Sequence, residues 1–381
     1  KDLYEGNNEI HNLLDIAMAL EGLPRQASTH ACGIIIAREP VVNYVPLYAR
    51  DDVISTQYIM TTLEELGLLK MDFLGLRTLT VIRDAIELVK KNKGIDVVFD
   101  KEMNDPKVYK LWQDGDSIGI FQFESQGMTN FMKELKPDCL EDIIAGVSLY
   151  RPGPMDQIPR YIANKKDPDN AVYTHPSLKP ILSVTYGCMV YQEQVMQIVR
   201  DLAGYSLGRA DLVRRAMGKK KLDVMAKERE NFVHGKLDEN GNVEIPGCVR
   251  NGIDEESANK IFDEMAEFAK YAFNKSHAAC YAVVAYRTAY LKAYYPAEFM
   301  AAMLNSFLGN LDKVPIYIEE CRKKSIEILK PDINESFTKF TASGNSIRFG
   351  LGSIKNVGLQ AVDNIVAERE KNGNYKDFTD F

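Results

Sequence analysis

The sequence predicts a mostly helical α+β protein, because its β-rich stretches are few and fall mainly in two regions. Apolar and β-branched runs typical of strands occur at 31–37, at 41–47 and around Asp72, and again between Ile328 and Phe349. Much of the remaining chain carries apolar residues at helical spacing. A chain of 381 residues is long for one hydrophobic core, which favours two or three domains.

The composition is ordinary for a globular protein, with 45% hydrophobic and 27% charged residues. A formal net charge of −7 argues mildly against a surface covered in nucleic-acid contacts, although it is compatible with a local basic groove. The six cysteines are more than 30 residues apart, so neither a zinc site nor a disulfide framework is indicated, which fits a reducing cytoplasm. No signal peptide is visible. The chain opens in mid-pattern at Lys1 and lacks a closing signal at Phe381, which suggests a piece of a longer protein.

The first part of the chain is expected to hold one helix and a small sheet. Apolar residues from Ile10 to Leu20 form a helical stripe, which Gly22-Leu23-Pro24 ends. The β-rich stretches 31–37 and 41–47 are expected to form a sheet with the strand around Asp72. His30 directly precedes the first of these strands, where it either caps the strand or lines a site.

The run 66–77 is apolar or glycine around Lys70 and Asp72, which predicts a buried or half-buried strand. A buried carboxylate must be hydrogen-bonded, paired or bound to a cation. Strand periodicity places Lys70 and Asp72 on the same face. Such a pair suits a metal-bound, negatively charged substrate, and the alternative is a structural ion pair at a strand end.

Helices are expected to follow, interrupted by one rigid loop. Thr80 to Lys91 carries apolar residues on one face, and Ile118 to Ser125 is a possible short hairpin strand. Arg151-Pro152-Gly153-Pro154 cannot be helical, because two prolines and a glycine force an extended loop. A guanidinium beside such a loop suits an anion or a base, although a surface turn is the alternative.

The most basic stretch of the chain follows two predicted helices. Tyr191 to Ala203 is amphipathic, and Ser206 is expected to cap a helix that runs through Met217. Cations then gather at Arg214, Arg215, Lys219, Lys220 and Lys221. Charge runs are usually solvated faces, but cations packed around a helix end favour contact with phosphate.

A second cluster opens a long predicted helix. Asp254 is expected to cap one helix, and Ser276 the next, which should run to Tyr294 before Pro296 begins another. Lys275, His277 and the free N–H groups of the helix would then face one point, which is suited to holding a phosphate. The alternative is a capped structural helix with a satisfied histidine.

The C-terminal part resembles a helix-hairpin-helix element. Ile316 to Lys324 is expected to be a short helix, and β-like runs occupy Ile328 to Phe349. An apolar hairpin with Lys355, Asn356 and Gly358 then precedes a helix. Such elements bind the DNA backbone through helix N-terminal amides. Asn356 stands where the first hairpin glycine is usual, and asparagine tolerates left-handed backbone.

In order along the chain, four motifs closely resemble the C-family replicative DNA polymerases of bacteria, the DNA polymerase III alpha-subunit family. They are KMDFLGLRT at 70–78, LYRPGPM at 149–155, RRAMGK at 214–219 and FNKSHA at 273–278. GLPR at 22–25 and HACG at 30–33 also look like that family. The resemblance covers nearly the whole chain.

The resemblance implies a division into the end of a thumb (1–27), the C-terminal part of a palm (28–80), fingers (81–305) and the start of a domain for duplex DNA and the sliding clamp (306–381). The palm would be a partial sheet of the beta-type nucleotidyltransferase fold. The implied reaction is template-directed transfer of dNMP from dNTP to a primer 3′-OH with two Mg²⁺ ions. The implied partners are primer-template DNA, the sliding clamp and other replisome subunits.

The resemblance also assigns roles to residues. Asp72 would be the third catalytic carboxylate and a metal ligand, and Lys70 a catalytic residue beside the triphosphate or the metal site. The implied nucleotide-binding residues are His30, Arg151, Arg214, Arg215, Lys219, Lys275, Ser276 and His277. The implied DNA-binding residues are Lys220, Lys221, Lys355, Asn356 and Gly358.

One departure from the family pattern concerns catalysis. The P-D-x-D-x-D-F motif that holds the family's first two catalytic carboxylates is absent from the 381 residues. Two-metal phosphoryl transfer needs several carboxylates, so the chain alone is expected not to polymerise. The alternative from another class is a non-catalytic scaffold that binds DNA or a clamp, with Lys70 and Asp72 as a structural pair. A metal-dependent nuclease is a weaker alternative, because no His/Asp cluster is visible.

Overall fold

The computed structural model describes residues 2–23, 28–30, 32–50, 52–218, 222–269, 271–308, 310 and 312–381. The chain divides into two compact units, Lys1–Leu76 and Arg77–Phe381. Small sheets and many helices make the protein a mostly helical α+β fold, as the sequence predicts. Among the described residues, no helix has the length and apolarity needed to cross a membrane.

The first unit combines short helices with two separate two-stranded sheets. Strand β1 (Gly33–Ile36) pairs antiparallel with β4 (Leu69–Asp72), and β2 (Leu47–Arg50) pairs antiparallel with β3 (Val53–Thr56). The helices are α1 (Asp2–Gly6), α2 (Asn8–Leu20) and α3 (Met60–Glu65). The buried core of this unit consists of Val45, Leu63 and Leu68, with a few half-buried neighbours.

Three expectations for this unit are wrong in part. The stretch 41–47 is not a strand, because Val41–Asn43 forms a 3₁₀ helix after Pro40 and β2 begins only at Leu47. The strands also form two sheets instead of one. Strand β4 is mostly exposed, whereas the apolar run predicted a buried or half-buried strand.

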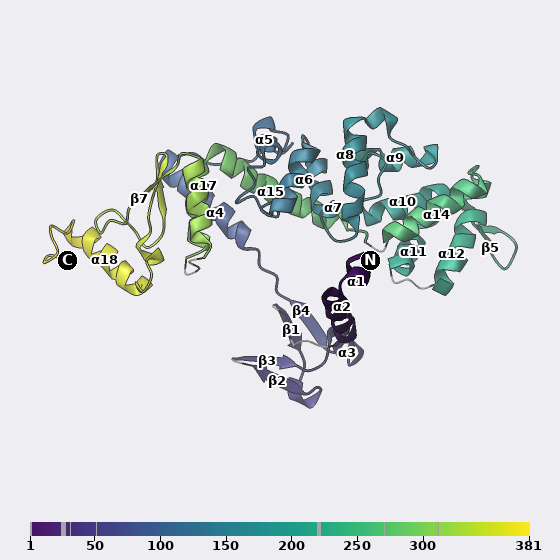
Figure 1. The fold of residues 1–381 in the computed structure, drawn as a ribbon, viewed down its shortest axis with the longest axis horizontal. Helices are drawn as coiled ribbons and strands as arrows, with labels where there is room; N and C mark the ends of the chain where they lie inside the picture. The colour runs from purple at the N-terminus through teal and green to yellow at the C-terminus, as the bar shows by residue number, and fades with distance from the viewer. Residues whose placement is uncertain are drawn as a thin grey trace. The chain divides into compact units, whose positions relative to one another are not determined.

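The second unit is mostly helical, and the long helix α15 (Lys275–Tyr294) connects two of its cores (Figure 1). One face of α15 packs with α5 (Pro106–Asp114), α6 (Gln126–Leu135) and α7 (Leu140–Leu149) around Trp112 and Tyr286. Near its C-terminus, Leu291 joins a core formed with α4 (Arg77–Lys93), α16 (Pro296–Ser306) and α17 (Val314–Lys323).

A further core holds the helices that carry the basic stretch. It is built from α10 (Gln192–Ala203), α11 (Leu207–Gly218), α12 (Leu222–His234) and α14 (Glu255–Ala269). Smaller elements connect these helices: α8 (Ile158–Lys166), α9 (Lys179–Leu182), α13 (Gly247–Arg250), the 3₁₀ helices Pro154–Gln157, Pro168–Asn170, Pro176–Leu178 and Ser183–Thr185, and the antiparallel pair β5 (Lys236–Leu237) and β6 (Val243–Ile245).

Two of the predicted helix caps in this unit are confirmed. The Ser206 hydroxyl accepts from the backbone N–H of Arg209 at 3.3 Å, and the Asp254 carboxylate accepts from Ser257 at 2.8 Å, as N-caps do. The suggested strand at 118–125 is wrong: Gly119 and Gln122 adopt positive φ angles of 82° and 69°, so the backbone turns. Ile120 and Phe123 are nevertheless fully buried.

The C-terminal part carries a three-stranded sheet and one helix. Strand β9 (Ser346–Arg348) pairs parallel with β7 (Glu327–Leu329) and antiparallel with β8 (Thr341–Ser343), which confirms the expected β-like runs. A 3₁₀ helix, Leu351–Ser353, and the hairpin at 354–358 lead into α18 (Leu359–Asn372).

Candidate active site and nucleotide-binding surface

Lys70 and Asp72 form an ion pair on one side of β4. The Lys70 Nζ atom lies 2.5 Å from Asp72 Oδ1, and the Lys70 side chain is 14% exposed while that of Asp72 is 42% exposed. The hydrogen bond and the positive charge of Lys70 lower the pKa of the Asp72 carboxyl. Asp72 is therefore held as an anion that faces solvent.

The start of β1 brings Gly33 and the preceding His30 close to Asp72. Gly33 lies directly opposite Asp72 in the β1–β4 register. The His30 Nδ1 atom accepts hydrogen bonds from the backbone N–H groups of Gly33, at 2.7 Å, and Cys32, at 3.3 Å. His30 therefore caps the start of the strand and also lines the group around Asp72, so the two alternatives for this residue are compatible.

The described residues do not by themselves fit a site for two Mg²⁺ ions. Mg²⁺ prefers oxygen ligands in octahedral geometry. Within the described part of the first unit, Asp72 contributes the one carboxylate to the grouped donor atoms there, beside the His30 ring and the Cys32 thiol. The Lys70 ammonium also occupies an oxygen of that carboxylate.

In the second unit, the starts of α10 and α15 lie side by side. Tyr191 and Phe273 form a parallel β-bridge, and the Gln192 backbone N–H donates to the Phe273 carbonyl at 2.8 Å. The Gln192 side-chain amide donates to the Ala272 carbonyl at 3.0 Å. Two segments about 80 residues apart are thereby joined where the predicted cations lie.

Arg214 reaches this junction from α11. Its Nη1 atom donates to the Gln192 side-chain oxygen at 3.1 Å, while Nε and Nη2 donate to Asp211 at 3.0 and 2.8 Å. Arg215 pairs with the other oxygen of Asp211 at 2.7 Å, and its side chain is 63% exposed. The hydrogen bond from Arg214 and the charges of both arginines lower the pKa of Asp211.

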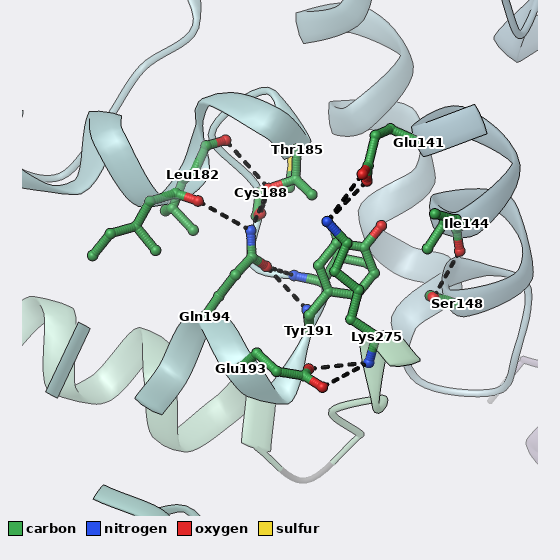
Figure 2. Close-up of polar contacts among 12 residues, drawn as sticks. Glu141, Ile144, Ser148, Leu182, Thr185, Cys188, Tyr191, Glu193, Gln194 and Lys275 are labelled. Atoms are coloured by element: carbon green, nitrogen blue, oxygen red, sulfur yellow. Dashed lines mark hydrogen bonds and ion pairs between the residues drawn. The ribbon is translucent and has the colours of Figure 1, made fainter. Parts of the chain in front are cut away.

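Lys275 is held by two carboxylates (Figure 2). Its backbone N–H donates to both oxygens of Glu193 at 3.1 and 3.0 Å, and its Nζ atom lies 3.0–3.1 Å from the oxygens of Glu141. A carboxylate at a helix N-terminus is stabilised by the helix dipole. In this structure, glutamate oxygens therefore contact Lys275 at the helix N-terminus for which the sequence predicts a phosphate.

The predicted cap at Ser276 is wrong. Asn274 is the N-cap of α15, and its side-chain oxygen accepts from the His277 backbone N–H at 2.9 Å. Asparagine directly before Lys275 was an available signal, because asparagine is among the most favoured N-cap residues. Ser276 and His277 lie exposed in the first turn of the helix.

Arg151 and His277 surround the Phe273 ring. The Arg151 guanidinium lies 3.8 Å from the ring centroid and donates to the carbonyls of Ser148 and Tyr271, each at 3.3 Å. Burial lowers the pKa of Arg151. The His277 ring packs edge-on against Phe273, with ring centroids 5.3 Å apart. The structure therefore gathers Arg151, Arg214, Lys275 and His277 around one junction.

The remaining predicted residues lie elsewhere or outside the described part. Lys219, Lys220 and Lys221 are not among the described residues. Lys355, Asn356 and Gly358 are exposed in the hairpin before α18. The prediction of left-handed backbone at Asn356 is confirmed by its φ of 66°, and Gly358 is the N-cap of α18.

Sequence reasoning did not single out Cys32, Gln192, Glu141 and Glu193, which complete these sites. Gln192 and Glu193 begin a helix that was predicted, but their partners Ala272 and Lys275 lie 80 or more residues away. Cys32 follows His30 by two residues, and this short spacing was a local signal that the two side chains could lie together.

Comparison with known protein families identifies the class of protein to which the chain belongs. Residues 1–75 match the family model described as "Bacterial DNA polymerase III alpha NTPase domain", and residues 78–240 match "Bacterial DNA polymerase III alpha subunit finger domain". Residues 325–381 match "Helix-hairpin-helix motif". The chain belongs to the bacterial DNA polymerase III alpha-subunit family.

Individual relatives carry the same name. The chain is 47% identical over its whole length to "DNA polymerase III subunit alpha" of Borreliella burgdorferi, of which it covers 32%. It is 48% identical over 99% of its length to the Thermus aquaticus protein of that name, and covers 30% of it. For the Staphylococcus aureus protein the identity is 44%, with 35% covered. The chain spans about a third of the length of these curated relatives.

Proposed function

We propose that this chain is the section of a replicative DNA polymerase that carries one catalytic carboxylate and the nucleotide-binding fingers. Similarity to DNA polymerase III alpha subunits across the whole chain carries this proposal. In the reaction, the primer 3′-oxygen bonds to the α-phosphorus of a dNTP, and the bond to pyrophosphate breaks. Because P-D-x-D-x-D-F is absent from this sequence, the chain alone should not polymerise.

On this proposal, the parts keep the roles that the family pattern suggests. Residues 1–27 are the end of the thumb, 28–80 part of the palm, 81–305 the fingers and 306–381 the start of the domain for duplex DNA and the sliding clamp. Lys220, Lys221 and the hairpin at 355–358 contact the DNA backbone. The complete polymerase works with other replisome subunits in the cytoplasm.

The incoming nucleotide would bind at the junction of α10 and α15. Arg151, Arg214, Lys275 and His277 lie there, and His30, Arg215, Lys219 and Ser276 are proposed to add to the same task. Charge-assisted hydrogen bonds to phosphate are about twice as strong as neutral ones. Glu141 and Glu193 hold Lys275 in this structure, so we propose that the triphosphate replaces these carboxylates when it binds.

Asp72 would serve as a metal ligand only together with other carboxylates. Asp72 would supply one oxygen ligand to a Mg²⁺ ion alongside carboxylates that this sequence does not contain, and the ion would supply charge neutralisation at the phosphoryl group. Lys70 would then turn from Asp72 toward the triphosphate. The proposal therefore assigns Asp72 a role in transfer and Lys70 a role in charge stabilisation.

Substitution of Asp72 tests the proposal in the full-length polymerase that carries this sequence. Asp72→Asn is expected to abolish primer extension with Mg²⁺, because the lost oxygen ligand stabilises charge in the transition state. Asp52→Asn, an exposed change in the turn between β2 and β3, is the matched control and should extend normally. Full extension by Asp72→Asn would mean that Lys70 and Asp72 are a structural pair, as the scaffold alternative requires.

A further inference from the structure

The group around Asp72 brings together three donor atoms of different kinds. One ligand atom each from His30, Cys32 and Asp72 lies within 4.8 Å of the other two. The His30 Nδ1 and Cys32 Sγ atoms are 3.7 Å apart. Asp72 and His30 are exposed, and Cys32 is half-buried, so an ion from solvent has access to all three.

The donor set and its spacing suit a thiophilic divalent cation. Zn²⁺ binds histidine nitrogen at about 2.0–2.1 Å and cysteine sulfur at about 2.3 Å in tetrahedral geometry, so the two atoms lie about 3.5 Å apart. The separation of 3.7 Å in this structure is close to that value. Mg²⁺ prefers oxygen ligands alone and does not suit a thiol and an imidazole.

Gly33 leaves room between these donors. A Cβ atom at this position would lie 2.9 Å from His30 Nδ1 and 3.1 Å from Asp72 Oδ1. Any other residue would therefore fill space beside the donor atoms. Glycine opposite Asp72 keeps the histidine and the carboxylate close enough to share one ion.

We propose that His30, Cys32 and Asp72 bind one thiophilic divalent cation of the Zn²⁺ type, with water in the fourth position. The Cys32 thiol loses its proton to solvent when the metal–sulfur bond forms. Three contacts are exchanged for the ion: the Lys70 ammonium leaves Asp72, and the N–H groups of Cys32 and Gly33 leave His30 Nδ1. This exchange makes the site weaker than a closed structural zinc site with four protein ligands.

If the proposed function holds, the ion would occupy the catalytic carboxylate and compete with Mg²⁺ there. The binding itself does not depend on that function. A failure of metal binding would leave the polymerase assignment untouched, and a failure of the polymerase assignment would leave the metal site testable.

The test is metal titration of the 381-residue chain. Cd²⁺ is followed by its thiolate-to-metal absorption in the ultraviolet, and Zn²⁺ by calorimetry. We expect one equivalent of either ion to bind. Cys32→Ser should remove the absorption, and His30→Ala should weaken binding at least about tenfold, since loss of outer-shell partners alone costs that much. Lys70→Met should tighten binding, because it removes the competing cation.

Two other cysteines provide matched controls. Cys280→Ser changes an exposed thiol far along the chain, and Cys139→Ser changes a thiol grouped with Asp138 and Asp142. Both variants should keep the absorption and the affinity. Absence of binding, or an absorption that follows Cys139 or Cys280 instead of Cys32, would overturn the proposal. Circular dichroism checks that each variant is folded. If Cys32→Ser is unfolded, Asp72→Asn serves in its place, and an unchanged metal affinity of Asp72→Asn would also overturn the proposal.

Discussion

At the scale of single residues, Gly33 provides the space in which Lys70 and Asp72 meet. A Cβ atom there would lie 2.8 Å from Lys70 Cε, closer than side chains pack. Lys70 is the long, flexible partner, so Gly33→Ala is expected to push its ammonium away from the carboxylate. The pKa of Asp72 should then rise toward its ordinary value, as a carboxyl NMR titration would measure.

Gly75→Ala is the control for this substitution. A Cβ at Gly75 would meet nothing within 4 Å, so the pKa of Asp72 should stay low. An unchanged titration of Asp72 in Gly33→Ala would show that the strand accommodates a side chain without disturbing the pair.

Arg214 is the residue best placed to separate nucleotide binding from DNA binding. In the full-length polymerase, Arg214→Ala should raise KM for dNTP about tenfold or more, because a charge-assisted phosphate contact contributes about 1.5–3 kcal/mol. Affinity for primer-template DNA should change much less. Steady-state kinetics and a DNA-binding titration measure the two effects separately.

Arg200→Ala is the matched control, since Arg200 also pairs with a neighbouring aspartate, Asp201, on the surface of α10. Its KM should be that of the unchanged enzyme. Equal losses of DNA affinity with no change in KM for Arg214→Ala would place Arg214 on the DNA backbone.

At the scale of elements, Lys292 ties α15 to α17 and to the loop after α5. Its buried ammonium lies 2.6 Å from Asp116 Oδ1 and 2.8 Å from Glu320 Oε1, and it donates to the carbonyls of Asp116 and Ile118. Lys292→Met leaves the buried Glu320 carboxylate without this cation and removes one of the two lysines that pair with the half-buried Asp116. The free energy of unfolding is expected to fall by about 3–5 kcal/mol, as measured by denaturant titration.

Lys323→Met, an exposed change on α17, is the control and should alter the unfolding free energy by no more than about 0.5 kcal/mol.

The pH dependence of the unfolding free energy gives a second readout. Burial would raise the pKa of Asp116, but Lys292 and Lys324 outweigh it and lower the pKa to about 2, below the ordinary 3.8. Asp116 therefore stabilises the fold above that ordinary value, and this contribution disappears as the pH falls through 2. In Lys292→Met, the unfolding free energy should fall less as the pH is lowered toward 2. An unchanged dependence of this free energy on pH would contradict the role given to Lys292.

Helices were predictable from sequence, whereas strands and turns were less so. The stripes and caps of α10, α11 and α14 are local, so spacing and Ser206 or Asp254 were sufficient to place them. The stretches 41–47 and 118–125 have strand-like composition, but the first begins with a 3₁₀ helix and the second turns at Gly119 and Gln122. In the second stretch, Ile120 and Phe123 are buried in a helical core, and composition does not distinguish a buried turn from a buried strand.

The candidate site residues could be picked out from the sequence by their chemistry, but most of their pairing partners could not. Lys70 and Asp72 are two residues apart, so strand periodicity was sufficient to bring them together. Lys275 is paired with Glu141, 134 residues away, and its N–H with Glu193, 82 residues away. Such partners depend on how helices pack, which no spacing rule within one helix contains.

At the scale of the molecule, the two units differ in how much core supports them. The helices of the second unit enclose large cores around Trp112, Phe262 and Phe299. In the described part of the first unit, the buried cluster is small, at Val45, Leu63 and Leu68, and each sheet has two strands. Isolated two-stranded sheets are marginally stable in water. We therefore expect the two units to open with different free energies.

Amide hydrogen exchange of the 381-residue chain measures this difference. Protection should be high in α10, α14, α15 and α16, because their amides lie in helices that pack against buried cores. It should be low in β4, where Phe73 and Leu74 just beyond the strand are 60% and 82% exposed. The open edges of these strands should also favour self-association at high concentration, which sedimentation would detect. High protection at residues 70–76 in a monomeric sample would contradict this expectation, because it would mean that the small first unit is stable on its own.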